Sequence, residues 1–146
     1  MYDVIVVGAG PAGNIAAHDL ARGGHRVAVF DWRRNIGDKL CTGIIGAECA
    51  RRYPPDEKHI YREARAATIV SPAGKRYRIT KRQPQAFIIN RVAYVDALAR
   101  RAIAAGAEYQ LGPRVTGVEL NPAMLEVSRD TYAEFAGHIY QSPIAE

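Results

Sequence analysis

The glycine-rich segment GAGPAG, residues 8–13, most constrains what this chain can fold into. It follows Val4-Ile5-Val6-Val7, a β-branched run typical of a strand buried on both faces of a parallel sheet. From Pro11 apolar residues recur at helical spacing, and proline suits a first helical turn, where its missing N–H is not needed. Gly23-Gly24 ends this helix, and residues 26–30 predict a second strand. Strand, glycine turn, helix and strand within about thirty residues form the context of a dinucleotide fingerprint.

Each glycine of this segment has a physical role in such a site. Gly8 permits the tight turn out of the strand, Gly10 lets the backbone approach a pyrophosphate, and Gly13 lets the helix pack closely on the strand. The helix N-terminus favours the anion. Asp31 ends the second strand, eighteen residues after Gly13, where it can accept hydrogen bonds from an adenosine ribose. The alternative is an ordinary βαβ unit with glycines for packing and Asp31 at the surface.

Length and composition narrow the class of protein. A chain of 146 residues with 48% hydrophobic residues can bury one good core, which favours one domain. We find no apolar run long enough to span a membrane and no basic segment typical of a signal peptide. Cys41 and Cys49 lack CxxC spacing and a histidine cluster, so we expect no disulfide framework, no metal site and a cytoplasmic location.

The formal net charge of +5 comes from basic residues in several short runs, including residues 75–82. Such runs can meet nucleic acid or anionic lipid, but they more often form solvated faces or help to hold a polyanionic cofactor. No basic motif interleaved with aromatic residues is present, so we expect no nucleic-acid binding.

The remaining elements alternate loops, strands and one long helix. Residues 35–53 predict a glycine-rich loop and then a helix, and Ser71-Pro72-Ala73-Gly74 has the residues of a hairpin turn. The further expected elements are strands over 66–70, 76–80, 86–89, 108–111 and 115–120, and a helix over 92–103 closed by Gly106. Together they predict a Rossmann-like FAD/NAD(P)-binding α/β domain. Its parallel sheet would come from residues 3–7, 26–30 and 107–120, and the hairpin would be an antiparallel addition.

Three quoted segments resemble a known family: VIVVGAGPAG, IGDKLCTGI and FIINRVAYVDALARRAIAAGAEYQLGPRV. Over residues 2–120 they are similar to the N-terminal part of the geranylgeranyl reductases, within the FAD-dependent oxidoreductases related to p-hydroxybenzoate hydroxylase. The strand–arginine–helix–glycine–strand block at 86–118 is typical of the wider class. The loop containing Cys41-Thr42-Gly43 indicates the reductase branch.

The resemblance implies FAD as the cofactor and assigns residues to it. Arg91 would reach the cofactor from a helix start, Arg33 or Arg34 would lie near the adenine or phosphate, and the backbone of Val115 would lie by the adenine. Cys41 would lie near the flavin ring, and it is the one candidate catalytic residue. The predicted cofactor-binding residues are Gly8, Gly10, Pro11, Ala12, Gly13, Asp31, Trp32, Arg33, Cys41, Thr42, Gly43, Arg91 and Val115.

The residue chemistry leaves alternatives at some of these positions. Arg91 is a permanent cation with a rigid donor fork, suited to a pyrophosphate or, otherwise, to the surface. Cys41 is either a near-flavin thiol or a small hydrophobe in a turn. Arg33 and Arg34 could accept the 2′-phosphate of NADP, but Asp31 argues against a phosphate there.

The chain also departs from the family pattern. Family enzymes are longer, with a second glycine-and-aspartate motif and a substrate domain, and Asp38 stands where proline often follows the IG pair. We therefore expect an incomplete FAD-binding domain over 1–120, an atypical tail over 121–146, and a truncated chain without activity of its own. In the tail, Tyr132, Phe135, Ile139 and Tyr140 predict a short amphipathic helix.

The main functional hypothesis is the FAD-binding part of a geranylgeranyl reductase-type enzyme. It would reduce carbon–carbon double bonds of prenyl lipids, with NAD(P)H as one candidate electron donor, and could associate peripherally with a membrane. Three alternatives stay open: a flavin-dependent monooxygenase or halogenase, a non-catalytic module that binds an adenine dinucleotide, and an NAD-binding domain without a flavin.

Overall fold

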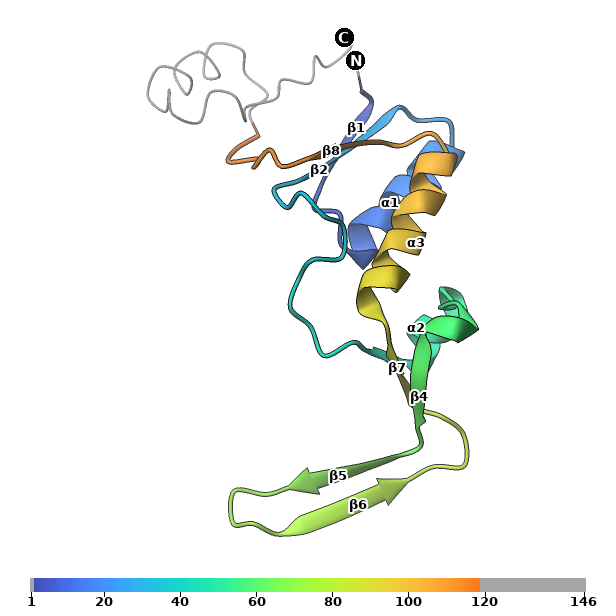
Figure 1. Cartoon of the computed structure of the whole chain (residues 1–146), viewed down its shortest axis with the longest axis vertical. Coiled ribbons are helices and arrows are strands. Elements are labelled where there is room, and N and C mark those ends of the chain that lie inside the picture. The colour runs from blue at the N-terminus through green and yellow to red at the C-terminus, as the bar shows by residue number, and fades with distance from the viewer. Residues whose placement is uncertain (1, 119–146) are drawn as a thin grey trace. The chain divides into compact units, whose positions relative to one another are not determined.

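The computed structural model describes residues 2–118, and these divide into two compact units. Among the described residues, one unit comprises residues 2–38 and 95–118 and the other residues 39–94 (Figure 1). The expected amphipathic helix and tail over 121–146 lie outside the described residues.

The first unit is built on a parallel three-stranded sheet. Its strands are β1 (Val4–Val7), β2 (Val27–Asp31) and β8 (Glu108–Leu111), in the order β1-β2-β8. Val4 pairs with Val27, and Ala28 pairs with Glu108, so β2 lies at the centre. Residues 27–30 are buried, as expected for a β-branched strand covered on both faces. The predicted parallel sheet is therefore confirmed for these three strands.

Two helices complete the first unit. Helix α1 (Pro11–Arg22) begins with proline at its first turn and presents Asn14, Ala17 and Ala21 to the interior. Helix α3 (Arg91–Ala104) contributes its residues from Val95 onward, of which Val95, Ala99 and Ala102 are completely buried. Small alanine side chains from both helices, Ala17 and Ala21 of α1 and Ala102 of α3, belong to one core cluster with Val27 and Val29 of β2.

The second unit is mostly antiparallel. Its three-stranded sheet has the order β3-β7-β4, formed by β3 (Ile44–Gly46), β7 (Ala86–Ile89) and β4 (Ile60–Ala64). Helix α2 (Ala47–Arg52) and the short 3-10 helix η1 (Glu57–His59) lie between β3 and β4 in the sequence. The predicted helix near residue 50 and the strand over 86–89 are confirmed, whereas β3 and β4 were not predicted.

A separate hairpin also belongs to the second unit. It joins β5 (Ala66–Val70) to β6 (Arg76–Thr80), with Val70 paired to Arg76 beside the turn. The predicted bounds and turn are confirmed, and Gly74 adopts the positive φ of 77° that the turn requires.

One predicted strand is wrong. We expected a strand over 115–120, but residues 113–118 form no regular element, and residues 119 and 120 lie outside the described part. Gly112 has a φ of 104° and Pro113 lacks a backbone N–H, so the chain leaves β8 at this point. Val115 therefore lies in an irregular segment, and its side chain is half-buried.

Candidate dinucleotide-binding site

The loop between β1 and α1 depends on Gly8 for its turn. Gly8 has a φ of 109°, a conformation that side-chain-bearing residues rarely adopt. Its N–H donates to the Phe30 carbonyl at 2.7 Å, which fixes the loop to the end of β2. The chain can then reverse from the strand into the helix without losing this backbone hydrogen bond.

Gly10 and Gly13 have opposite surroundings. A Cβ on Gly13 would lie 1.9 Å from the carbonyl oxygen of Gly8, so the helix approaches the strand end too closely for any side chain. A Cβ on Gly10 would meet no atom within 4 Å, and Gly10 has an ordinary φ of −77°. Gly13 is therefore required by packing within the fold, whereas Gly10 leaves open space at the start of α1.

The N-terminus of α1 is suited to an anion. Gly10 is its N-cap, and no side chain caps the helix. The first turn contains Pro11 and no acidic residue, so the positive end of the helix dipole is not neutralised by its own sequence. Backbone N–H groups of such a turn are donors of the kind that bind pyrophosphate.

Asp31 lies beside this loop at the end of β2. One carboxylate oxygen accepts from the N–H of Ala9 at 2.9 Å, and the other accepts from the N–H of Arg33 at 2.9 Å. The side chain is 14% exposed, and Arg33 lies 3.9 Å from it. Each oxygen retains a further lone pair, so the oriented carboxylate can also accept from a hydroxyl group.

Two other predicted residues lie next to Asp31 in the sequence. The guanidinium carbon of Arg33 is 4.3 Å from the centre of the Trp32 ring, a cation–π arrangement. Trp32 is 55% exposed, so this pair presents a flat, partly apolar surface to the solvent.

Asn14 is a residue that the sequence reasoning missed. It is fully buried, and its amide donates to the carbonyls of Ala9 at 3.1 Å and Val95 at 3.2 Å. Its amide oxygen accepts from the hydroxyl of Tyr109 at 2.8 Å. The network ties the glycine loop to α3 and β8. One feature of the sequence could have indicated that Asn14 is buried: its spacing places it on the same face of the helix as Ala17 and Ala21.

The predicted site residues Cys41, Thr42, Gly43 and Arg91 belong to the second unit and are described there alone. A guanidinium N–H of Arg91 donates to the carbonyl of Lys39 at 3.0 Å. Gly43 has a φ of 71°, and a Cβ there would lie 2.8 Å from the Ile89 carbonyl oxygen. The Gly43 carbonyl accepts from the N–H of Ile89 at 2.9 Å, so the loop is anchored to β7.

Cys41 lies in this same loop and is exposed. Hydrogen bonding from the backbone of Gly43 lowers the pKa of its thiol, and the positive charge of Arg91 adds to this effect. Both influences favour the thiolate, the reactive form of cysteine. Among the described residues there is no cluster of side chains that could hold a metal ion.

Together, the glycine loop, the uncapped helix start and the oriented carboxylate have the arrangement that is typical of α/β dinucleotide-binding domains. Residues 2–132 match the pyridine nucleotide-disulphide oxidoreductase family, and the chain belongs to that family.

Two named reductases are similar in sequence to most of this chain. The digeranylgeranylglycerophospholipid reductase of Methanosarcina mazei is 32% identical over 88% of this chain and 33% of its own length. The reductase of the same name from Methanocella arvoryzae is 35% identical over 80% of this chain and 31% of its own length. The chain thus spans about one third of these relatives, and its resemblance to the geranylgeranyl reductases is confirmed for the N-terminal part.

Solved structures share the fold. A geranylgeranyl bacteriochlorophyll reductase-like protein from Thermoplasma acidophilum has a TM-score of 0.74 and 26% identity, over 83% of this chain and 32% of its own. The flavin-dependent brominase Bmp2, as a triple mutant, has a TM-score of 0.65 and 20% identity, over 83% of this chain and 32% of its own. The second likeness concerns the fold alone.

Proposed function

We propose that residues 8–13 and Asp31 bind the adenosine diphosphate portion of FAD. The observation that carries this proposal is the open space at Gly10. Gly10 is the N-cap of α1, which no side chain caps, and it directly follows Ala9, whose N–H donates a hydrogen bond to Asp31. The pyrophosphate would receive N–H groups from the first turn of α1, and Asp31 would accept from the ribose. The resemblance to the geranylgeranyl reductases implies FAD, and the similarity to the reductase relatives supports it over NAD alone.

The wider function proposed is that of a flavin-dependent reductase acting on carbon–carbon double bonds of prenyl lipids. This rests on the names of relatives that are about three times as long as this chain. Bound reduced flavin supplies the hydride. The described residues would hold and orient the cofactor. We further propose that Cys41 lies near the flavin, where the hydrogen bond from the backbone of Gly43 lowers the pKa of its thiol and so favours the thiolate.

Gly10→Ala tests the cofactor site because it separates binding from folding. The substitution places a methyl group in the space proposed for the pyrophosphate, while the backbone conformation suits alanine. We expect FAD affinity, followed by flavin fluorescence, to fall by at least about tenfold, with the unfolding midpoint nearly unchanged. Gly46→Ala, where a Cβ would also meet no atom within 4 Å, is a control for glycine substitution as such, and it should leave FAD affinity unchanged.

Asp31→Asn tests the ribose contact in the same assay. The amide group must turn an NH2 toward one of two backbone donors, so the loop and the ribose site are both perturbed. We expect weaker binding of FAD and of ADP alike. If the unmodified chain bound neither, the cofactor proposal would be wrong; binding of NAD but not FAD would favour the non-flavin alternative.

A further inference from the structure

The carbonyl of Ala9 faces the buried side chain of Asn14. It accepts a hydrogen bond of 3.1 Å from the Asn14 amide, which is fully buried, and Ala9 is itself only 3% exposed. The N–H of Ala9 donates to a carboxylate oxygen of Asp31 at 2.9 Å. Side chains therefore hold both polar backbone groups of this residue.

The direction of the Ala9 carbonyl also fixes the direction of the Gly10 N–H. The two groups belong to one peptide bond, and the described residues contain no cis peptide bond. In a trans peptide the C=O and the N–H point in opposite directions, so the Gly10 N–H points away from Asn14. None of the hydrogen bonds within residues 2–118 uses this N–H, and a Cβ built at Gly10 meets no atom within 4 Å.

The amide of Asn14 is held in one orientation. Its NH2 group donates to the carbonyls of Ala9 and, at 3.2 Å, of Val95. Its oxygen accepts from the hydroxyl of Tyr109 at 2.8 Å. A reversed amide would place its oxygen against two carbonyl oxygens, neither of which can donate. The two carbonyls thus decide the orientation, and Tyr109 adds a contact that the orientation does not require.

We infer that Asn14 is a positioning residue for the pyrophosphate of the bound dinucleotide. It holds the Ala9 carbonyl in the interior and thereby keeps the Gly10 N–H directed toward the ligand oxygens. Binding then costs no reorientation of this peptide, which is how a preorganised site gains affinity. The inference rests on the proposed function, because it takes residues 8–13 as the site of the dinucleotide. Asn14 itself is buried and acts through Ala9.

The direction of the Gly10 N–H can be measured without a ligand. Its residual dipolar coupling in the isotope-labelled full chain reports the orientation of that bond. We expect Asn14→Leu, which is similar in size but cannot donate, to change this coupling. Asn14→Ala, which removes the amide without adding a branched side chain, should also change it, whereas Tyr109→Phe should not. An unchanged coupling in the Asn14 variants would overturn the inference.

Ligand affinity separates positioning from stability. We expect both Asn14 variants to weaken ADP binding by at least about tenfold, and binding of adenosine, which has no pyrophosphate, by less than about twofold. Tyr109→Phe should change neither affinity. Leu98→Ala, at a buried position of α3 outside the glycine loop, is the control for lost stability and should also change neither. Equal losses for ADP and adenosine, or an equal loss in Leu98→Ala, would show a structural role alone and overturn the inference.

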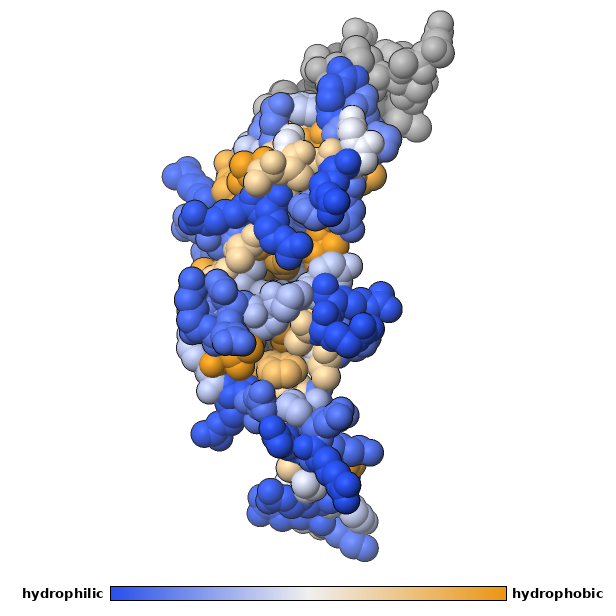
Figure 2. All heavy atoms as spheres, turned by 90° about the vertical axis from the view of Figure 1, so that its right-hand side faces the viewer, coloured by the Kyte–Doolittle hydropathy of each residue, from blue (hydrophilic) through white to orange (hydrophobic). Residues whose placement is uncertain are grey.

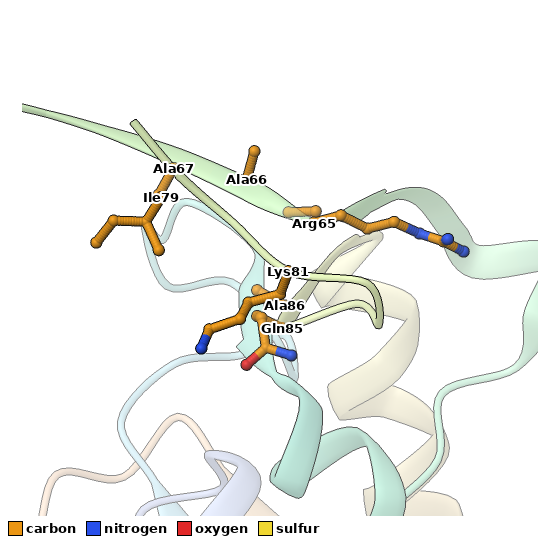
Figure 3. A pocket seen from close by; sticks show the side chains of 8 residues that line it. Arg65, Ala66, Ala67, Ile79, Lys81, Gln85 and Ala86 are labelled. Carbon is orange, nitrogen blue, oxygen red and sulfur yellow. The ribbon is translucent and has the colours of Figure 1, made fainter. Parts of the chain in front are cut away.

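The β5–β6 hairpin needs a control because it can attract ADP by charge alone. Residues 65–82 contain six cations and no acidic residue, and the lower end of Figure 2, where the hairpin lies, is mostly hydrophilic. Figure 3 shows the side chain of Lys81 beside that of Gln85 at a pocket of about 250 Å³. Lys75→Gln/Lys81→Gln should leave the ratio of ADP to adenosine affinity unchanged. A loss of ADP binding as large as in the Asn14 variants would place ADP on the hairpin and overturn the inference.

The two measurements also distinguish this inference from the proposed function. If the unmodified chain bound no ADP, the proposed function would be wrong, and the inference with it. ADP binding together with an unchanged dipolar coupling in the Asn14 variants would overturn the inference alone.

Discussion

The buried amide oxygen of Asn14 accepts a hydrogen bond of 2.8 Å from the hydroxyl of Tyr109. The two residues are 95 positions apart, one on α1 and one on β8. Because the Asn14 amide also binds the Ala9 carbonyl, this pair links the glycine loop to the third strand of the parallel sheet. The shape of the candidate site thus depends on a side chain that contacts no proposed ligand group.

Replacing Asn14 by leucine should destabilise the protein. The Ala9 and Val95 carbonyls and the Tyr109 hydroxyl each lose a hydrogen-bond partner in a buried environment. We expect the free energy of unfolding in urea to fall by about 2–4 kcal/mol, and that of Tyr109→Phe by about 1–2 kcal/mol. The double variant should lose less free energy of unfolding than the two single variants lose together. A loss equal to their sum would show that Asn14 and Tyr109 are not coupled.

Tyr109 should make the free energy of unfolding depend on pH in the alkaline range. Burial raises the pKa of its hydroxyl to about 12, above the usual value near 10. Above pH 10 the unfolded chain releases this proton and the folded chain keeps it, so stability is full below pH 10 and falls between about pH 10 and 12. Urea unfolding across this range should show a smaller fall for Tyr109→Phe than for the unmodified chain. Tyr61→Phe, at an exposed position, is the control and should behave as the unmodified chain does.

Gly13→Ala should damage both folding and cofactor binding. The new methyl group would overlap the carbonyl oxygen of Gly8, a backbone atom that cannot turn aside as a flexible side chain could. We expect a loss of about 3 kcal/mol in the free energy of unfolding. An alanine variant of normal stability would contradict the close approach, and Gly46→Ala, where no atom lies within 4 Å, is the matched control.

Cys41 should be more reactive than an ordinary thiol at neutral pH. In a Cys49→Ser background, the rate of alkylation by iodoacetamide against pH should give a midpoint below the usual cysteine pKa, because Gly43 and Arg91 favour the thiolate. Arg91→Gln should move that midpoint upward, and Arg91→Lys should restore much of the effect. An unchanged midpoint in Arg91→Gln would show that the charge of Arg91 does not act on Cys41.

The sequence predicts the elements that have a strong local pattern. The run Val27–Phe30 and the helix that includes Val95 combine an apolar pattern with a glycine boundary. The turn at Ser71–Gly74 is marked by its proline and its glycine. Strand β3 has three residues, too few to show alternation, and the exposed centre of β4 obscures its pattern. The predicted strand over 115–120 failed because β propensity says nothing of whether a pairing partner is present.

The candidate site was only partly predictable for a related reason. Gly8, Gly13 and Asp31 follow from a spacing that fixes backbone geometry, and the structure places all three around one turn. The network of Asn14 depends on the carbonyl of Val95 and the hydroxyl of Tyr109, which meet only after the chain has folded. The assigned contacts of Arg91, Thr42 and Val115 with a cofactor remain predictions.

The contrast between Gly10 and Gly13 also offers a way to sort related sequences. Packing alone demands a glycine at the position of Gly13, so a domain that has lost its nucleotide would still retain it. Within residues 2–118 no atom lies within 4 Å of a Cβ built at Gly10, so in this part of the chain a bound ligand is what would exclude a side chain there. A relative with alanine or serine at that one position is therefore expected to keep this architecture after dinucleotide binding has been lost.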